Sequence, residues 1–143
     1  MRSLFAFVCL SMSLILAGCG TPPERRLESP ALRVTGLEAG VLKVSILNPN
    51  AVPLVINRSS YLLSLGDERI GRIDDRTPLG VPSLAALPCT VTLPAPVSEK
   101  VRAYFAKHPG EVRAFLESTL EVAVGSDDTI TLKASGGGSV KAP

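Results

Sequence analysis

The chain has few of the side chains on which most enzyme mechanisms depend. Its 143 residues include one histidine and three cysteines. A Ser-His-Asp or Cys-His arrangement would have to use His108, which lies beside Pro109 at the end of an expected helix. The sequence also lacks a Gly-x-Ser-x-Gly elbow, a phosphate-binding loop and a metal-spaced Cys/His cluster. It therefore predicts a protein that is not an enzyme and has no cofactor.

Neither sign of charge dominates the sequence. The 15 Lys and Arg residues and the 13 Asp and Glu residues are spread along the chain. A nucleic-acid-binding protein would need a clustered basic face, so no nucleic-acid partner is predicted. Adjacent acidic residues occur as three pairs, Asp67-Glu68, Asp74-Asp75 and Asp127-Asp128. Each pair falls in an expected turn and none has the spacing of a calcium loop, so no metal site is predicted.

The apolar run near the N-terminus is too short to span a membrane. It extends from Leu4 to Leu16 after Arg2, which is typical of a secretory signal. We therefore expect residues 1–18 to be a signal peptide. The length that remains suits a single domain, because a chain of this size can bury about two-thirds of its unfolded surface.

The end of this signal predicts lipid attachment. The residues Leu16-Ala17-Gly18-Cys19 resemble a bacterial lipobox, which makes Cys19 the residue that carries diacylglycerol. In the lipoproteins that it resembles, Asp after this cysteine retains the protein in the inner membrane, and here the position is Gly20. The expected location is the cell envelope, at the periplasmic side of the outer membrane in a two-membrane cell. Residues 19–29 have no apolar periodicity and are expected to form a tether.

Cysteine usage excludes an intrachain disulfide in the mature chain. Cys9 is removed with the signal and Cys19 is used for lipid, which leaves Cys89 alone. Leu87, Cys89 and Val91 alternate along one face of an expected strand. Cys89 is therefore predicted to pack in the core.

The most informative stretch runs from Val41 to Leu65. Leu42, Val44 and Ile46 alternate with polar residues, which is the period of a half-buried strand. Asn48-Pro49-Asn50 then predicts a turn, because Pro49 has a fixed φ and Asn50 tolerates a left-handed backbone. A second extended run follows, from Val52 to Leu65.

The remaining pattern predicts a small antiparallel β-sandwich, similar to immunoglobulin or fibronectin domains, with one helical insertion. The insertion is expected around residues 98–117, with Ser98 as the N-cap and a second helical piece or an early strand from Val112. Further strands are expected at residues 32–37, 68–73, 87–93, 120–124 and 130–132, with a bulge at Gly71. The domain is expected to occupy residues 30–134, followed by a flexible glycine-rich tail at residues 135–143.

The strand that runs into Asn48-Pro49-Asn50, followed by Pro53 and by the strand Tyr61-Leu62-Leu63-Ser64-Leu65, is a family pattern. It resembles the WHy (water stress and hypersensitive response) domain of the type 2 late embryogenesis abundant proteins, over residues 31–132. The resemblance implies a non-catalytic module that responds to stress such as desiccation. It would protect neighbouring envelope proteins by weak binding while tethered to the membrane. An alternative is an assembly or adaptor lipoprotein that binds one envelope protein through a sheet edge.

Overall fold

The computed structural model describes residues 26–38, 40–124 and 128–142. The expected signal peptide at residues 1–18 and the lipid-attachment residue Cys19 lie outside these ranges. The strands are β1 (Ala31–Glu38), β2 (Val41–Leu47), β3 (Leu54–Leu65), β4 (Glu68–Asp75), β5 (Leu79–Val81), β6 (Ala86–Thr92), β7 (Glu111–Val124) and β8 (Asp128–Lys141), and the helix is α2 (Ala95–Lys107). In the described part of the chain, no helix has both the length and the apolar character needed to cross a membrane.

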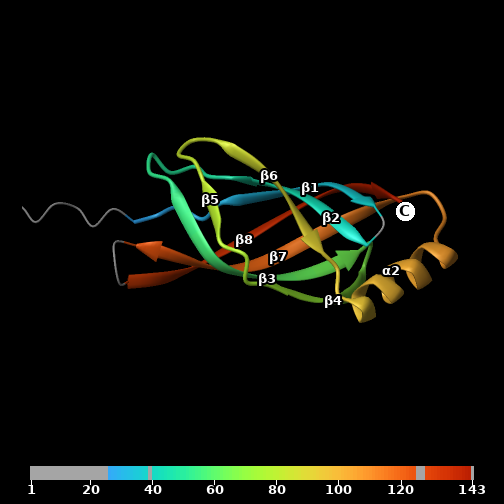
Figure 1. The fold of residues 1–143 in the computed structure, drawn as a ribbon. Helices are drawn as coiled ribbons and strands as arrows, with labels where there is room; N and C mark the ends of the chain where they lie inside the picture. The colour runs from blue at the N-terminus through green and yellow to red at the C-terminus, as the bar shows by residue number, and fades with distance from the viewer. Residues whose placement is uncertain (1–25, 39, 125–127, 143) are drawn as a thin grey trace, which may run out of the picture.

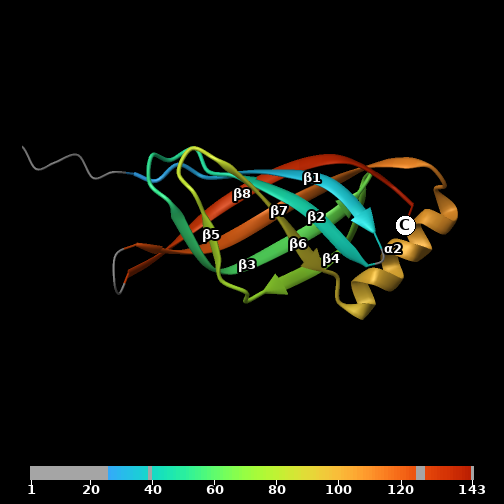
Figure 2. The same ribbon diagram turned by 45° about the horizontal axis from the view of Figure 1, so that its top comes forward.

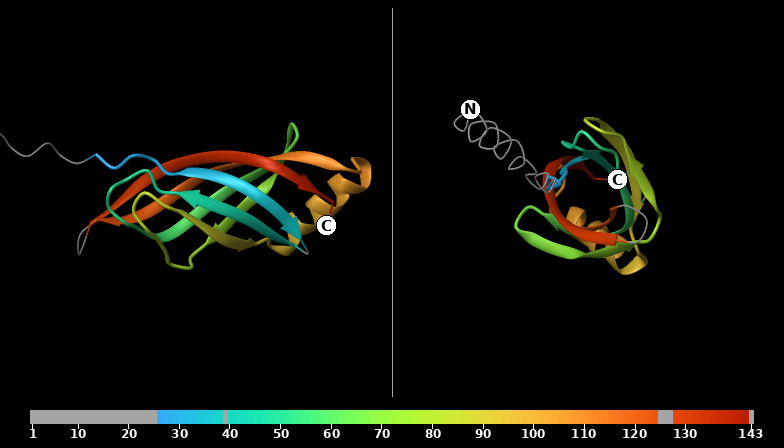
Figure 3. Two further views of the ribbon diagram at one scale, coloured as in Figure 1. Left: turned by 90° about the horizontal axis from the view of Figure 1, so that it is seen from above. Right: turned by 90° about the vertical axis from the view of Figure 1, so that its left-hand side faces the viewer.

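The strands form one curled sheet (Figure 1). Their order is β4-β3-β7-β8-β1-β2-β6, and β5 pairs with the other end of β3 beside β4. The pairs are antiparallel except for β1 with β8, which is parallel. The predicted mainly β class is confirmed, but the antiparallel sandwich is not, because the strands lie on one hydrogen-bonded path that curls into a half-barrel (Figure 3). The long strands β7 and β8 lie in the middle of the strand order, and their accumulated twist contributes to the curl of the sheet.

The predicted alternation in β2 is confirmed. Leu42, Val44 and Ile46 are fully buried, whereas the residues between them are partly exposed. The predicted bulge in β4 is also confirmed, because Leu63 pairs with Gly71 while the next residue of β3 pairs with Arg69. A Cβ at Gly71 would lie 2.9 Å from Val97 Cγ2, so glycine here lets helix α2 approach the sheet.

The helical insertion is shorter than predicted and begins earlier. Helix α2 starts after Pro94 with no side-chain cap, so Ser98 is not the N-cap, and proline in the first turn initiates the helix instead. Gly110, with φ 116°, follows the helix, and β7 begins at Glu111. Of the two alternatives from Val112 onward, the early strand is confirmed and the helical piece is wrong, because this segment pairs with β3 on one side and β8 on the other.

The expected flexible tail is wrong for residues 135–141, which continue β8. Gly136 pairs with Leu32 in the parallel β1–β8 ladder. A Cβ at Gly136 would overlap the carbonyl oxygen of Leu32, and one at Gly138 would overlap that of Val34. The glycine run therefore permits a close backbone approach that joins the two halves of the sheet.

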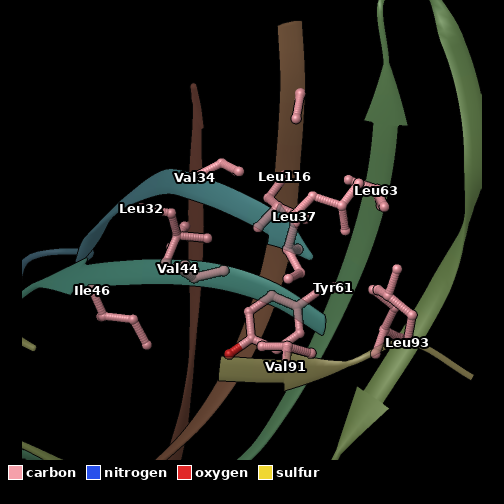
Figure 4. Packing of buried hydrophobic residues seen from close by; sticks show 14 of the residues in the cluster. Leu32, Val34, Leu37, Val44, Ile46, Tyr61, Leu63, Val91, Leu93 and Leu116 are labelled. Atoms are coloured by element: carbon pink, nitrogen blue, oxygen red, sulfur yellow. The ribbon is translucent and has the colours of Figure 1, made fainter. Parts of the chain in front are cut away.

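One apolar core fills the inside of the curl. Figure 4 shows side chains from β1, β2, β3 and β6 pointing toward one another, among them Leu37, Leu63 and Val91. Helix α2 adds Val97, Val101 and Phe105 to this core and packs against β4. The helix lies at one end of the sheet, opposite the end where residue 26 enters (Figure 2).

Candidate functional site

The predicted turn residue Asn48 lies at the centre of a buried hydrogen-bond network. Its side chain is fully buried, and Nδ2 donates to the carbonyl oxygens of Val52 at 2.9 Å and Pro82 at 3.0 Å. A longer contact of 3.3 Å to the carbonyl of Val81 shares one of these protons, because an amide nitrogen carries only two. Asn48 Oδ1 accepts from the backbone N–H of Asn50 at 2.9 Å. The amide therefore holds two loops together.

The second asparagine of the turn extends this network to the N-terminal segment. Asn50 Oδ1 accepts from the backbone N–H of Glu28 at 2.7 Å, and Asn50 Nδ2 donates to the carbonyl of Glu28 at 2.9 Å. Both backbone groups of one residue are thus bound by one side chain. The chain is fixed to the domain at Glu28, before β1 begins.

The backbone of the turn also binds the loop between β5 and β6. The N–H of Asn48 donates to the carbonyl of Ala85 at 2.9 Å, and the N–H of Leu84 donates to the carbonyl of Asn50 at 3.0 Å. Pro49 is partly buried between the two asparagines. The structure therefore places Asn48, Pro49 and Asn50 in a junction of three segments, which we call the asparagine junction.

Sequence reasoning found the turn and missed the junction. A signal was present, because residues 44–57 carry no charged side chain and yet contain Asn48 and Asn50. Buried amides must be hydrogen-bonded, so two asparagines inside an apolar stretch indicate specific backbone partners. The identity of these partners depends on which loops meet at this end of the sheet, which the local pattern does not encode.

A broad hollow of about 550 Å³, which we call the outer hollow, lies on the outer face of β3, β7 and β8. Residues that line it are Ser60, Leu62, Arg72, Glu117, Thr119, Lys133 and Ser135. Arg72 Nε donates to Ser60 Oγ at 2.7 Å and lies 3.4 Å from Asp74 Oδ1. Hydrogen bonding with Ser60, and then the charge of Arg72, lower the pKa of the exposed Asp74. This hollow offers hydroxyls and charges of both signs for reversible polar contacts.

A smaller cavity of about 90 Å³ lies between β6 and the edge formed by β3, β4 and β5. Tyr61, Asp75 and Cys89 contribute to its lining. Burial raises the pKa of the Tyr61 phenol and of the Cys89 thiol, and the charge of Asp75 adds to both shifts. Cys89 is partly buried, as the predicted packing role requires, and its raised pKa makes it a poor nucleophile.

Two further sequence predictions can be located. His108 follows the last residue of α2, where its N–H donates to the carbonyl of Tyr104 and its ring lies 4.5 Å from the Tyr104 ring. Asp67-Glu68 lies at the β3–β4 turn as expected, whereas Asp74-Asp75 is paired with β3 at the end of β4 and not in a turn; Asp127 lies outside the described residues. Within residues 26–38, 40–124 and 128–142, no group of three His, Cys, Asp or Glu side chains could hold a metal ion.

A family model described as "Late embryogenesis abundant protein" matches residues 43–137, from β2 to the glycine run of β8. The chain belongs to this family. The resemblance read from the Asn48-Pro49-Asn50 pattern is thereby confirmed. Asn48, Pro49, Asn50 and Gly136 all lie inside the segment of this late embryogenesis abundant protein that the family model matches.

One solved structure is similar to this chain at the level of the fold, and two others match it with lower TM-scores. The solution structure of AT1g01470 from Arabidopsis thaliana is 20% identical with a TM-score of 0.54, over 92% of this chain and 95% of that one. A putative late embryogenesis abundant protein, At2g46140.1, is 22% identical with a TM-score of 0.45, over 96% and 85%. A protein from Archaeoglobus fulgidus is 14% identical with a TM-score of 0.45, over 82% and 98%. No curated protein matches this late embryogenesis abundant chain.

Proposed function

We propose that this chain is a lipid-anchored, non-catalytic stress module that protects neighbouring envelope proteins by weak binding. The observation that carries the proposal is membership of the late embryogenesis abundant family, whose model covers residues 43–137. The lipobox-like sequence ending at Cys19 supports the anchor. A covalent lipid would hold the domain near its membrane and raise its local concentration around envelope proteins.

The outer hollow, which presents both polar and apolar surface, is suited to weak and unselective contact. It is wide, open and lined by hydroxyl groups, with Arg72, Glu117 and Lys133 supplying charges of both signs. Exposed charge pairs contribute little individually, so contacts made here would be weak and exchange rapidly. Such contacts suit a protein that must shield many surfaces transiently.

The alternative is an adaptor that accepts a partner strand at a sheet edge. The strand path ends at β4 and β6, so both offer unpaired backbone. However, β6 contains Pro88, which has no N–H to donate, and β4 contains Arg69, Arg72 and Asp74 together with a bulge. Proline, charges and bulges are the features that block strand addition. The edges of this sheet therefore favour the stress module over the adaptor.

The protective role can be tested with a drying-sensitive reporter enzyme. The enzyme would be dried with residues 21–143, or with an equal mass of an unrelated β domain, then rehydrated and assayed. Retained activity well above that control supports protection. Activity equal to the control, together with one stoichiometric partner after crosslinking in cells, would support the adaptor instead.

The anchor is tested separately by membrane fractionation. The wild-type precursor should yield an acylated protein in the membrane fraction, and Cys19→Ser should yield a protein without acyl chains. An acylated, membrane-bound Cys19→Ser protein would show that Cys19 is not the attachment residue.

A further inference from the structure

Two long segments of the chain carry no charged residue and meet at the end of the sheet where the N-terminal segment enters. Residues 44–57 and 77–98 contain no Asp, Glu, Lys, Arg or His, although 20% of the whole sequence is charged. Their loops, residues 48–53 and 82–85, are joined by the backbone bonds from Asn48 to Ala85 and from Leu84 to Asn50. The two loops themselves therefore carry no charged side chain, although the exposed Glu28 is bound to the same junction through its backbone.

Apolar side chains are exposed on the same loops. Leu84 is 70% exposed, Leu47 46% and Val52 36%. Leu47 precedes Asn48 and pairs with Ala86, and the carbonyl of Val52 accepts from Asn48, so the three lie around one junction. We call Leu47, Val52 and Leu84 the apolar tip. Single exposed apolar residues are common, but a group on adjoining loops indicates an interaction surface.

The backbone of Leu84 strengthens this interpretation. Its φ is 52°, in the left-handed region that glycine and asparagine adopt readily, whereas a leucine there costs about 1 kcal/mol. The bond from its N–H to the carbonyl of Asn50 holds this conformation. Leucine thus adds strain and exposes an apolar side chain, with no packing in the fold to compensate. A contact outside the fold would explain this combination of strain and exposure.

The position of the N-terminal segment indicates what this contact is. Asn50 fixes Glu28 at the same junction, and Cys19 lies nine residues before Glu28. Nine extended residues span about 30 Å at most, so a lipid on Cys19 would hold the apolar tip close to the membrane. Helix α2 lies at the opposite end of the sheet (Figure 3). The tip therefore lies at the anchored end of the domain, the end where β7 finishes and β8 begins (Figure 3).

We propose that the apolar tip inserts Leu84, with Leu47 and Val52 beside it, into the headgroup region of the membrane that holds the lipid anchor. This inference rests on the proposed lipid attachment. Apolar side chains on uncharged loops can enter the boundary between headgroups and acyl chains, and anchoring keeps the tip at high local concentration there. Insertion would fix the orientation of the domain, with the tip down and helix α2 away from the membrane.

The test uses the full-length precursor, processed in a host that acylates lipoproteins. In a Cys89→Ser background, Leu84→Cys is labelled with an environment-sensitive fluorophore, and Lys107→Cys at the far end of α2 is the matched control. The acylated proteins are reconstituted into phosphatidylethanolamine and phosphatidylglycerol vesicles whose acyl chains carry bromine. We expect a blue shift and a several-fold loss of fluorescence at residue 84, with neither at residue 107.

The possible outcomes separate the two proposals. A protein that carries the lipid and floats with the vesicles, but whose label at residue 84 behaves like that at residue 107, overturns tip insertion and leaves the anchor intact. A blue shift at residue 84 without quenching by brominated lipid also overturns it, in favour of a contact with protein. A protein without acyl chains that does not float overturns the anchor, and tip insertion with it.

A second variant shows that the tip is not needed for folding. Leu84→Asn removes the exposed apolar side chain and suits the left-handed backbone without the extra unfolded-state freedom of glycine, so its urea midpoint should equal or exceed that of the wild type. A lower midpoint would mean that Leu84 serves the fold, which would overturn the inference. Asn50 provides no such test, because it also holds Glu28.

Discussion

The amide of Asn48 satisfies backbone groups that no other side chain reaches at the asparagine junction. Replacing it by alanine would leave the carbonyls of Val52 and Pro82 without their donor and the N–H of Asn50 without its acceptor. Because each buried unpaired group costs about 1 to 3 kcal/mol, Asn48→Ala should lower the free energy of unfolding by about 2 to 4 kcal/mol. Urea denaturation followed by circular dichroism measures this change.

The exposed Asn57 provides a matched control for this prediction. Asn57→Ala makes the same chemical change on β3 and should alter the unfolding free energy by less than about 0.5 kcal/mol. Equal effects of the two variants would mean that the network around Asn48 contributes no special stability.

Asn50 is expected to act on the N-terminal segment more than on the core. Its side chain binds both backbone groups of Glu28, so Asn50→Ala should release this residue while β2 and β3 stay paired. A glutamate-specific protease should then cut after Glu28 several times faster than in the wild type, since cleavage requires local opening. Cleavage at the exposed Glu99 of α2 is the internal reference and should keep its rate. An unchanged rate at Glu28 would show that the segment is held by other contacts.

Among the elements, the parallel pair β1–β8 depends most on a single residue type. Gly136→Ala would place a Cβ against the Leu32 carbonyl, and backbone cannot yield as a flexible side chain can. We expect a loss of at least about 2 kcal/mol of unfolding free energy, measured from the urea midpoint. Gly80→Ala in β5 is the control, because its Cβ would enter open space. If both variants unfold at the same midpoint, β8 does not approach β1 as described.

The elements also show how far sequence reasoning reaches. Period-two alternation located β2 and the buried face of β3, because both strands expose one face and bury the other. The same reasoning failed at Gly136, where composition indicated a flexible tail and the actual cause of the glycines is a strand contact distant in sequence. After Val112 it left both a helical piece and an early strand open, and the pairing of β7 with β3 and β8 decided for the strand. Non-local pairing decided both cases, and local patterns do not contain it.

At the scale of the whole molecule, the two ends of the half-barrel differ in character. One end holds the asparagine junction and the apolar tip, and the other holds helix α2 with Lys100, Arg102 and Lys107 exposed. In the sequence, the loops of the first end belong to two uncharged segments, residues 44–57 and 77–98, the second of which runs on into the start of α2. These loops become a single surface only when β2, β3, β5 and β6 bring them together. The fold therefore gives the domain two chemically different ends, and one of them is built from segments that are distant in sequence.

The cavity between β6 and the opposite edge of the half-barrel makes the stability of the whole domain sensitive to alkaline pH. Tyr61 and Cys89 face the cavity between β6 and the opposite edge, beside Asp75, and burial raises the pKa of both above the ordinary values of 10.0 and 9.0. In the unfolded chain the two groups lose protons at lower pH than in the folded one. The unfolded state therefore binds fewer protons above about pH 9, and the free energy of unfolding falls as pH rises.

The combined variant Tyr61→Phe with Cys89→Ser removes both protons and should flatten this decline. The unfolding free energy of this variant, measured with urea between neutral pH and about pH 11, should fall less steeply with pH than that of the wild type. Tyr104→Phe is the matched control, because it removes the chain's other tyrosine and leaves the cavity unchanged, so its slope should stay steep. If the combined variant declines as steeply as the wild type, ionisation elsewhere in the domain sets the alkaline limit, and the cavity between the two sheet edges does not.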